Sequence, residues 1–223
     1  MKKVLNFMKN TKFRNLILLT FLLFLYVFIS AQSYVTAISS NLSQAVFRLH
    51  VIANSDSDED QALKLKVRDA LLDYMNDISS DCSTKEEAIS LANEHKSDFQ
   101  SIAEKTIAEN GYDYSVEINI GNFYFPTKNY GDISLPAGFY DALRVEIGEA
   151  KGKNWWCVMF PSLCFIDVSS GVVDEEAKEN LEQNLEEESY DIISNNSNSE
   201  IKFKFKLIEF FAEKGLFTAD KNI

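Results

Sequence analysis

The chain has 223 residues, with 34 acidic and 22 basic side chains and a formal net charge of −12. This acidity argues against nucleic acid as a partner, because a phosphate backbone repels a negatively charged surface. Only eight glycines and two histidines occur, and the motifs of zinc hydrolases, serine hydrolases, calcium loops and phosphate-binding loops are missing from the sequence. We therefore expect no metal, no cofactor and no catalytic residue of these classes, while a carboxylate pair for glycoside cleavage stays open, because 34 acidic residues supply such pairs by chance.

The first 31 residues have the order of an export signal. Five basic side chains come first: Lys2, Lys3, Lys9, Lys12 and Arg14. An apolar run from Leu16 to Ile29 follows, and small residues after it offer cleavage sites at Ala31 and Ala37. The run is shorter than the roughly twenty residues that cross a bilayer, so cleavage is favoured, while retention as a membrane anchor stays open. In both cases the body of the protein faces the far side of the membrane.

We expect one domain after this leader. Residues 32–45 are interpreted as a linker, 46–214 as a single extracytoplasmic domain and 215–223 as a carboxy-terminal tail. Without residues 1–31, 17 basic side chains face 34 acidic ones, so the exported body is strongly acidic. Its length is sufficient for one proper hydrophobic core.

The first elements of the body are a strand and a helix. Branched and aromatic residues predict a strand over Val46–Ala53, and Asn54, Ser55 and Asp56 supply the turn that ends it. Ser57 or Asp58 caps a helix that runs from about Glu59 to Asp77. Its apolar stripe consists of Leu63, Val67, Ala70, Leu71, Tyr74 and Ile78.

This helix has a second apolar side, which carries Leu65 and Leu72 next to Arg68. At 100° per residue these side chains lie opposite the main stripe. One interpretation is a helix sandwiched between the sheet and a second helix. The other is an exposed ridge that binds a partner.

A second long helix is predicted from a capping box at Ser83 and Glu86 to a stop at Asn110–Gly111. His95 falls on its apolar face and is interpreted as a core residue. Alternation predicts a half-buried strand over Tyr112–Ile120, followed by a turn-rich loop folded over the core.

Two further strands, Phe139–Ile147 and Asn154–Phe160, are predicted to pair as a hairpin. The second is apolar on both faces, which favours a central strand over one with a face reserved for a partner. After Phe165 an acidic segment follows, and the last element, 200–214, is predicted as a helix. The expected fold is therefore α+β: two long helices packed on a mainly antiparallel sheet with a hairpin, preceded by a signal or anchor helix.

Three cysteines, Cys82, Cys157 and Cys164, are too few for a disulfide framework. Outside the membrane a disulfide between Cys157 and Cys164 is permitted, with buried thiols as the alternative. A cysteine nucleophile would need a nearby histidine, and Cys157 with His50 is the pairing to test.

Two sets of residues resemble the stage II sporulation protein R family. The first is Phe47–Asp56, followed by Asp60-Gln61 and Leu63–Asp69. The second comprises Gly131-Asp132, Leu135–Gly138, Tyr140, Leu143–Val145 and the Trp-Trp-Cys segment that ends at Phe165. Both motifs are long and occur in the family's order, so the resemblance is specific and covers about Phe47 to Asp167. Cys82 and the acidic segment after Val173 have no place in the family pattern.

The resemblance implies a signalling protein of endospore-forming bacteria. Such a protein is made in the forespore and exported into the space between the forespore and mother-cell membranes. There it activates a membrane-embedded aspartic protease, stage II sporulation protein GA, which removes the pro-sequence of sigma-E in the mother cell. The resemblance thus implies a ligand and not an enzyme, and the family pattern supplies neither a fold nor a catalytic residue.

A protein ligand needs a contact surface, and the sequence offers candidates on one loop, one helix and one strand. They are Asn54, Ser55, Asp56, Asp60, Leu65, Arg68, Leu72, Trp155, Trp156 and Phe160. Each also has a structural interpretation, as turn or cap, sandwiched helix or buried strand. The rival functions are an exported cell-wall or peptide hydrolase and a passive module of a septal complex.

Overall fold

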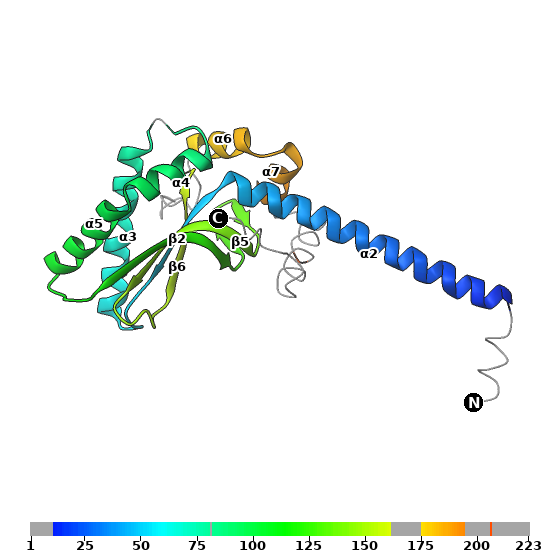
Figure 1. Cartoon of the computed structure of the whole chain (residues 1–223), viewed down its shortest axis with the longest axis horizontal. Helices are drawn as coiled ribbons and strands as arrows, with labels where there is room; N and C mark the ends of the chain where they lie inside the picture. Colours follow the sequence, from blue (N-terminus) through cyan, green and yellow to red (C-terminus); the bar gives the residue numbers. More distant parts are fainter. Residues whose placement is uncertain (1–10, 81, 162–174, 195–205, 207–223) are drawn as a thin grey trace, which may run out of the picture. The chain divides into compact units, whose positions relative to one another are not determined.

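The computed structural model describes residues 11–80, 82–161, 175–194 and 206. In these residues a long helix and one strand come first, followed by three helices, five strands and two short helices; Figure 1 shows their arrangement. The chain divides into two compact units, Met1–Ile38 and Ser39–Ile223. The fold class predicted from the sequence is confirmed: an apolar amino-terminal helix comes before a body of mixed helix and mainly antiparallel sheet.

The amino-terminal helix α2 (Thr11–Ala45) is long and apolar enough to cross a membrane. Its large apolar side chains from Leu16 to Ile29 are exposed. This agrees with a signal or an anchor. Residues 32–45, the predicted linker, are helical and complete α2. The last turns belong to the body, where Leu42 is fully buried.

The predicted first helix is confirmed as α3 (Asp58–Ile78). Ser57 is its N-cap, and its Oγ accepts a hydrogen bond of 3.2 Å from the backbone N–H of Asp60. Three acidic residues occupy the first turn, where the positive end of the helix dipole favours them.

The predicted second long helix is wrong, because the structure divides it into α4 (Lys85–Glu94) and α5 (Lys96–Glu109). His95 separates them: it ends α4, and its ring Nδ1 lies 2.8 Å from both Tyr74 Oη and Asp98 Oδ2. These bonds hold the bend against α3. The capping box is formed by Thr84 and Glu87, one residue later than predicted.

The main sheet contains β1 (Phe47–Ile52), β2 (Val116–Phe125), β5 (Gly138–Ile147) and β6 (Asn154–Phe160) in the order β2-β5-β1-β6. The last two strands lie where predicted, but their direct pairing is wrong. β1 lies between them, parallel to β5 and antiparallel to β6. Every residue of β1 is buried, so this strand is the one that occupies the centre. The predicted strand 112–120 begins at Val116 and continues to Phe125.

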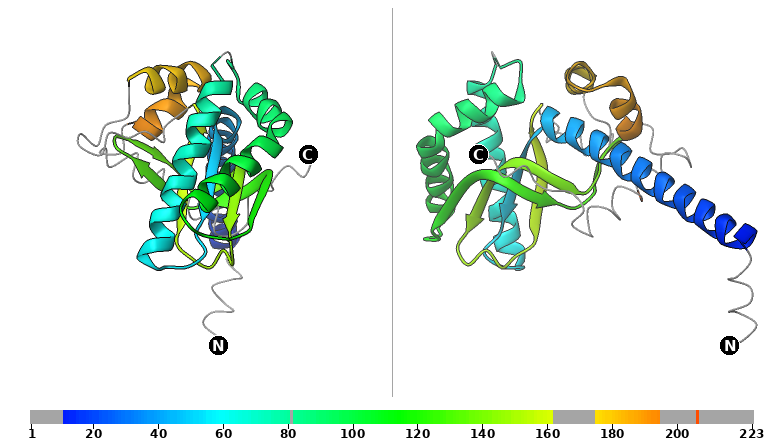
Figure 2. Two further views of the ribbon diagram at one scale, coloured as in Figure 1. Left: turned by 90° about the vertical axis from the view of Figure 1, so that its left-hand side faces the viewer. Right: turned by 45° about the vertical axis from the view of Figure 1, so that its right-hand side comes forward.

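The favoured central position of the tryptophan strand is also wrong, because β6 is the edge of the described sheet. Helices α3, α4 and α5 cover one face of the sheet (Figures 1 and 2). The core between them takes alternate residues of each strand, such as Leu49 of β1 and Met159 of β6.

The loop before β5 contains a small hairpin, β3 (Lys128–Tyr130) and β4 (Ile133–Leu135). Its Tyr130, Ile133 and Leu135 are buried, which agrees with a loop folded over the core. Two short helices follow in the acidic segment, α6 (Glu175–Asn184) and α7 (Glu187–Ser194), and α7 packs near β4. The predicted helix over 200–214 lies outside the described residues except for Lys206, and the tail 215–223 lies wholly outside them.

Candidate partner-binding site

The predicted contact loop is a structural clamp. Asn54 donates from Nδ2 to Asp60 Oδ2 at 2.8 Å and accepts at Oδ1 from the backbone N–H of Glu149 at 2.9 Å. Asp56 Oδ1 accepts from the backbone N–H of Lys153 at 2.7 Å. These bonds join the loop after β1 to the connection between β5 and β6. A Cβ on Gly152 would lie 2.2 Å from the Ser55 carbonyl oxygen, so the two loops touch through their backbones.

Asp60 is the centre of this clamp. It is 5 % exposed, and burial alone would raise the pKa of its carboxyl. Hydrogen bonds from Ser55, Asn54 and Tyr114 outweigh burial and hold the pKa below its ordinary value. Asp60, Asn54 and Ser55 therefore stabilise the fold. Of the four predicted contacts in this loop, Asp56 is exposed, Asn54 and Ser55 are half-buried and Asp60 is buried.

We expect the Asp60→Asn variant to unfold at a lower denaturant concentration than the parent at pH 7, because the amide cannot accept all of these bonds. Since the folded pKa of Asp60 is depressed, its contribution is present above the unfolded value of about 3.9 and is lost as the pH falls through the folded value. The difference between the two proteins should thus shrink below about pH 4. Denaturant unfolding of the full-length chain in micelles, at pH 7 and pH 3, measures it. An equal difference at both pH values would contradict this role.

The second side of α3 is only partly open. Leu72 is 1 % exposed and belongs to the hydrophobic core, so its prediction as an exposed contact is wrong. The reason is that α3 is sandwiched, with α5 and the sheet both packed against it. Leu65, two turns earlier, is half-buried, and Arg68 is also half-buried.

Arg68 and Trp155, two predicted contacts from distant parts of the sequence, lie together. The Arg68 guanidinium carbon is 4.3 Å from the centre of the Trp155 ring, and Arg68 Nε also donates to Asp69 Oδ1 at 2.7 Å. Trp155 is half-buried, and its indole Nε1 is buried without a hydrogen-bond partner in the described part of the chain. We call Arg68, Trp155 and the outer edge of β6 the Arg68–Trp155 platform.

The platform has the chemistry of a protein contact. Tryptophan and arginine are the residues that most often dominate binding energy at protein interfaces. The edge strand adds backbone N–H and C=O groups that no strand of the described sheet pairs with, and such an edge accepts a partner strand.

Trp156 faces the other side of the sheet, because adjacent residues of a strand point to opposite faces. Its ring stacks on His50, with the centroids 3.7 Å apart, and meets Phe125 edge-on at 4.8 Å. His50 Nε2 lies 2.8 Å from Asn154 Oδ1. Trp156 is therefore held in an aromatic cluster and is separated by the sheet from Trp155.

Sequence reasoning missed the buried Arg48 that completes this cluster. Arg48 is fully buried, lies 4.1 Å from the Phe125 ring centre and donates from Nη2 to Tyr130 Oη at 2.6 Å. Among the described residues no carboxylate pairs with it, so aromatic faces and hydrogen bonds stabilise the charge. It holds the β3–β4 hairpin on the sheet. The sequence did contain a signal for this cluster: Arg48 and His50 lie two residues apart, and so on one face, in an otherwise apolar strand.

Burial, opposed by the hydrogen bond with Asn154 and helped by the nearby charges of Arg144 and Arg48, lowers the pKa of His50 to about 4. His50 is therefore neutral in the folded protein at pH 7, when its unfolded value is about 6.5.

We expect the parent protein to lose stability as the pH falls from about 6.5 to about 4, because the unfolded chain then binds a proton that folded His50 does not. The full loss is on the order of 3 kcal/mol. The His50→Gln variant should lack this part of the pH dependence. Denaturant unfolding at pH 7 and pH 4.5 tests it, and an unchanged slope in the variant would contradict the assignment.

The geometry excludes a nucleophile made of Cys157 and His50. In the β1–β6 register Cys157 faces Leu49 and belongs to the core on the helix side, while His50 lies on the opposite face. Cys157 is moreover disulfide-bonded. Cys164, its predicted partner, lies outside the described residues, so that pairing stays a prediction.

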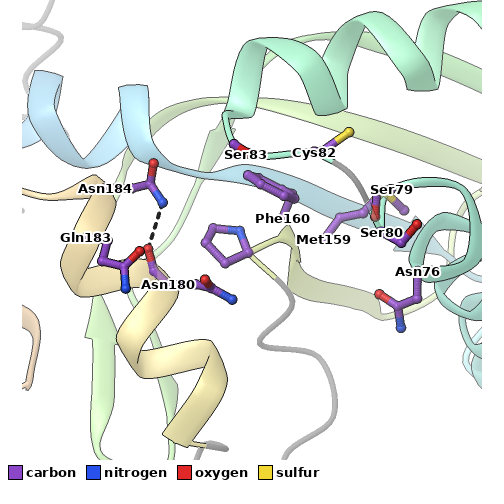
Figure 3. Close-up of a pocket in the computed structure, with 11 residues that line it drawn as sticks. Asn76, Ser79, Ser80, Cys82, Ser83, Met159, Phe160, Asn180, Gln183 and Asn184 are labelled. Carbon is purple, nitrogen blue, oxygen red and sulfur yellow. Dashed lines mark hydrogen bonds between the residues drawn. The ribbon is translucent and has the colours of Figure 1, made fainter.

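Phe160, the last predicted contact, lies at the end of β6 and lines a pocket of about 360 Å³ (Figure 3). The ring is half-buried. Phe160 lies at the opposite end of β6 from Trp155. The ten predicted contacts therefore form several separate groups, in one of which the half-buried side chains of Arg68 and Trp155 meet.

Comparison with known proteins gives the chain a family. The family model described as stage II sporulation protein R matches residues 43–170, more than half of the chain. These residues run from the last turn of α2 to just beyond β6, and so include the whole sheet.

A curated relative supports the same assignment. Stage II sporulation protein R of Bacillus subtilis (strain 168) is 38% identical over 147 residues, which are 65% of this chain and 66% of the relative. The match thus spans just under two thirds of the relative's length. No solved structure matches the chain.

The two motifs that carry the resemblance meet in the fold: β1 pairs with both β5 and β6, and the loop after β1 is bonded to the loop between them. The family model covers this sheet and more than half of the chain, and a curated relative of the same description is 38% identical over 147 residues, so the chain belongs to the stage II sporulation protein R family.

Proposed function

We propose that this protein is an exported signal of sporulation that activates a membrane-embedded aspartic protease, stage II sporulation protein GA, which then processes pro-sigma-E in the mother cell. Membership of the stage II sporulation protein R family carries the proposal, because it assigns the chain a role in sporulation. In this proposal the chain is a ligand and carries out no reaction itself.

The leader supports the direction of the signal. The basic residues before α2 and the apolar helix itself are those of an exported or anchored protein. Made in the forespore, the body would enter the space between the forespore and mother-cell membranes, where the protease presents its extracytoplasmic surface. The acidity of the body keeps it from adhering to anionic lipid.

The Arg68–Trp155 platform is the surface that we assign to the protease. It combines a half-buried tryptophan, an arginine on its face and the strand edge of β6 that no described strand pairs with. The loop from Asn54 to Asp60 fixes the start of β6, because Asp56 Oδ1 accepts a hydrogen bond from the backbone N–H of Lys153. Leu65 of α3 is half-buried and adds apolar area on the same helix.

The proposal is tested in a sporulating strain that lacks its own family member. The chain is expressed in the forespore, and conversion of pro-sigma-E to sigma-E is followed by immunoblot. Conversion should return with the full chain and not with a variant that lacks residues 1–31. A strain in which conversion stays absent although the exported chain accumulates would overturn the proposal.

A second host separates direct activation from indirect effects. The chain, the protease and pro-sigma-E are produced together in a bacterium that does not sporulate. Processing that requires both the chain and the protease supports direct activation, whereas processing by the protease alone at the same rate contradicts it.

A further inference from the structure

We propose that the pocket at the end of β6 binds a short, neutral, N-acetylated oligosaccharide. We call it the β6 pocket and define it by Asn76, Ser79, Ser80, Phe160, Asn180 and Gln183. Its volume of about 360 Å³ lies at the lower end of the range for small-ligand sites, and suits one or two sugar rings.

The pocket has two polar walls. Figure 3 shows Asn180, Gln183 and Asn184 of α6 on one side of Phe160, and Asn76, Ser79 and Ser80 from the end of α3 on the other. The side-chain amides of Asn76, Asn180 and Gln183 make no hydrogen bond within the described residues, whereas Asn184 Nδ2 donates to Asn180 O at 2.7 Å. Three amides are therefore available to a ligand, and each can both donate and accept.

The lining is neutral in a chain that is rich in charge. Although the sequence has 34 acidic and 22 basic side chains, the described residues that line the β6 pocket are all of uncharged types. A phosphate or carboxylate ligand would find no cation among them. Most small-ligand pockets are predominantly apolar, so this polar, uncharged lining indicates a ligand that hydrogen-bonds and carries no charge.

The apolar part of the lining is small and lies at the end of β6. The half-buried Phe160 ring, together with Met159 and Pro161, provides it. A sugar ring is complementary to this arrangement, since it has an apolar C–H face for an aromatic ring and hydroxyl groups around its rim. An N-acetyl substituent adds an amide that can bond reciprocally with an asparagine or glutamine side chain. Ser79 and Ser80 supply hydroxyls that suit the sugar hydroxyls.

The test uses N,N′-diacetylchitobiose and the full-length chain in nanodiscs. Titration calorimetry measures the affinity of the parent, of an Asn76→Ala/Gln183→Ala double variant, and of Asn93→Ala. Asn93 is a matched control, because it is an exposed asparagine on α4 whose amide bonds to its own helix at Ile89 O. The double variant should bind at least about tenfold more weakly, since each lost hydrogen bond contributes about 1 kcal/mol. The control should bind like the parent.

Absence of chitobiose binding by the parent, or equal binding by the double variant, would overturn the proposal. Binding of trialanine in preference to chitobiose would also overturn it and assign the pocket to a peptide. The double variant should still support conversion of pro-sigma-E if the β6 pocket is separate from the Arg68–Trp155 platform, so failure of this inference is distinguishable from failure of the proposed function.

Discussion

Replacing Leu72 by serine is expected to lower the free energy of unfolding by about 3–5 kcal/mol. Leu72 is 1 % exposed in the core between α3 and its neighbours, so the change removes buried apolar area, leaves a cavity and buries a hydroxyl. This loss is a large fraction of the stability of an ordinary domain. Denaturant unfolding of the full-length chain in micelles measures it.

Leu65→Ser is the matched control for this prediction. Leu65 lies on the same helix but is half-buried, so its replacement should cost about 1 kcal/mol or less. If the two variants lost the same stability, the assignment of Leu72 to the core and Leu65 to the partly open side of α3 would be wrong.

Arg68→Ala is expected to lower conversion of pro-sigma-E by about tenfold or more while the protein stays folded. Truncating a central arginine of a protein interface typically costs at least about 2 kcal/mol of binding energy. The fold loses only a cation–π contact and a partly exposed ion pair with Asp69, about 1 kcal/mol together. The two-component assay in the non-sporulating host, combined with unfolding of the purified variant, measures both effects.

Lys105→Ala is the control for Arg68→Ala. Lys105 is an exposed cation on α5 whose only described ion pair is a weak one with Glu109 at 3.8 Å. The Lys105→Ala substitution removes one positive charge, as Arg68→Ala does, but from α5, and it should leave conversion of pro-sigma-E unchanged. Full activity of Arg68→Ala, or equal loss in both variants, would remove the platform from consideration as the contact surface.

The corrections to the predicted topology share one cause. Alternation located β5 and β6 correctly, since a period of two residues reports that a strand has two faces. It carries no information on which strand lies beside it, and proximity in sequence then suggested a hairpin. The actual neighbour is β1, whose residues are buried throughout and require a strand on each side.

The second long helix, which the structure divides into α4 and α5, shows the same limit of prediction from a local sequence pattern. Residues 85–109 have helical periodicity on both sides of His95, so the sequence pattern favours one helix. The bend depends on the contacts that His95 Nδ1 makes with the side chains of Tyr74 and Asp98. Tyr74 belongs to a different helix, α3. A partner that lies 21 residues earlier in the chain cannot be recognised from a local pattern.

The sequence by itself determined the apolar leader, the extent of α3 and most strands, the α+β class and the family, because each depends on local order or on motifs that are continuous in the chain. Only the tertiary structure decided that β6 is an edge strand, that Leu72 is core, and that Arg68 meets Trp155. It also revealed the buried Arg48 and the β6 pocket. These features join residues from distant segments, and their burial follows from long-range packing that no local periodicity contains.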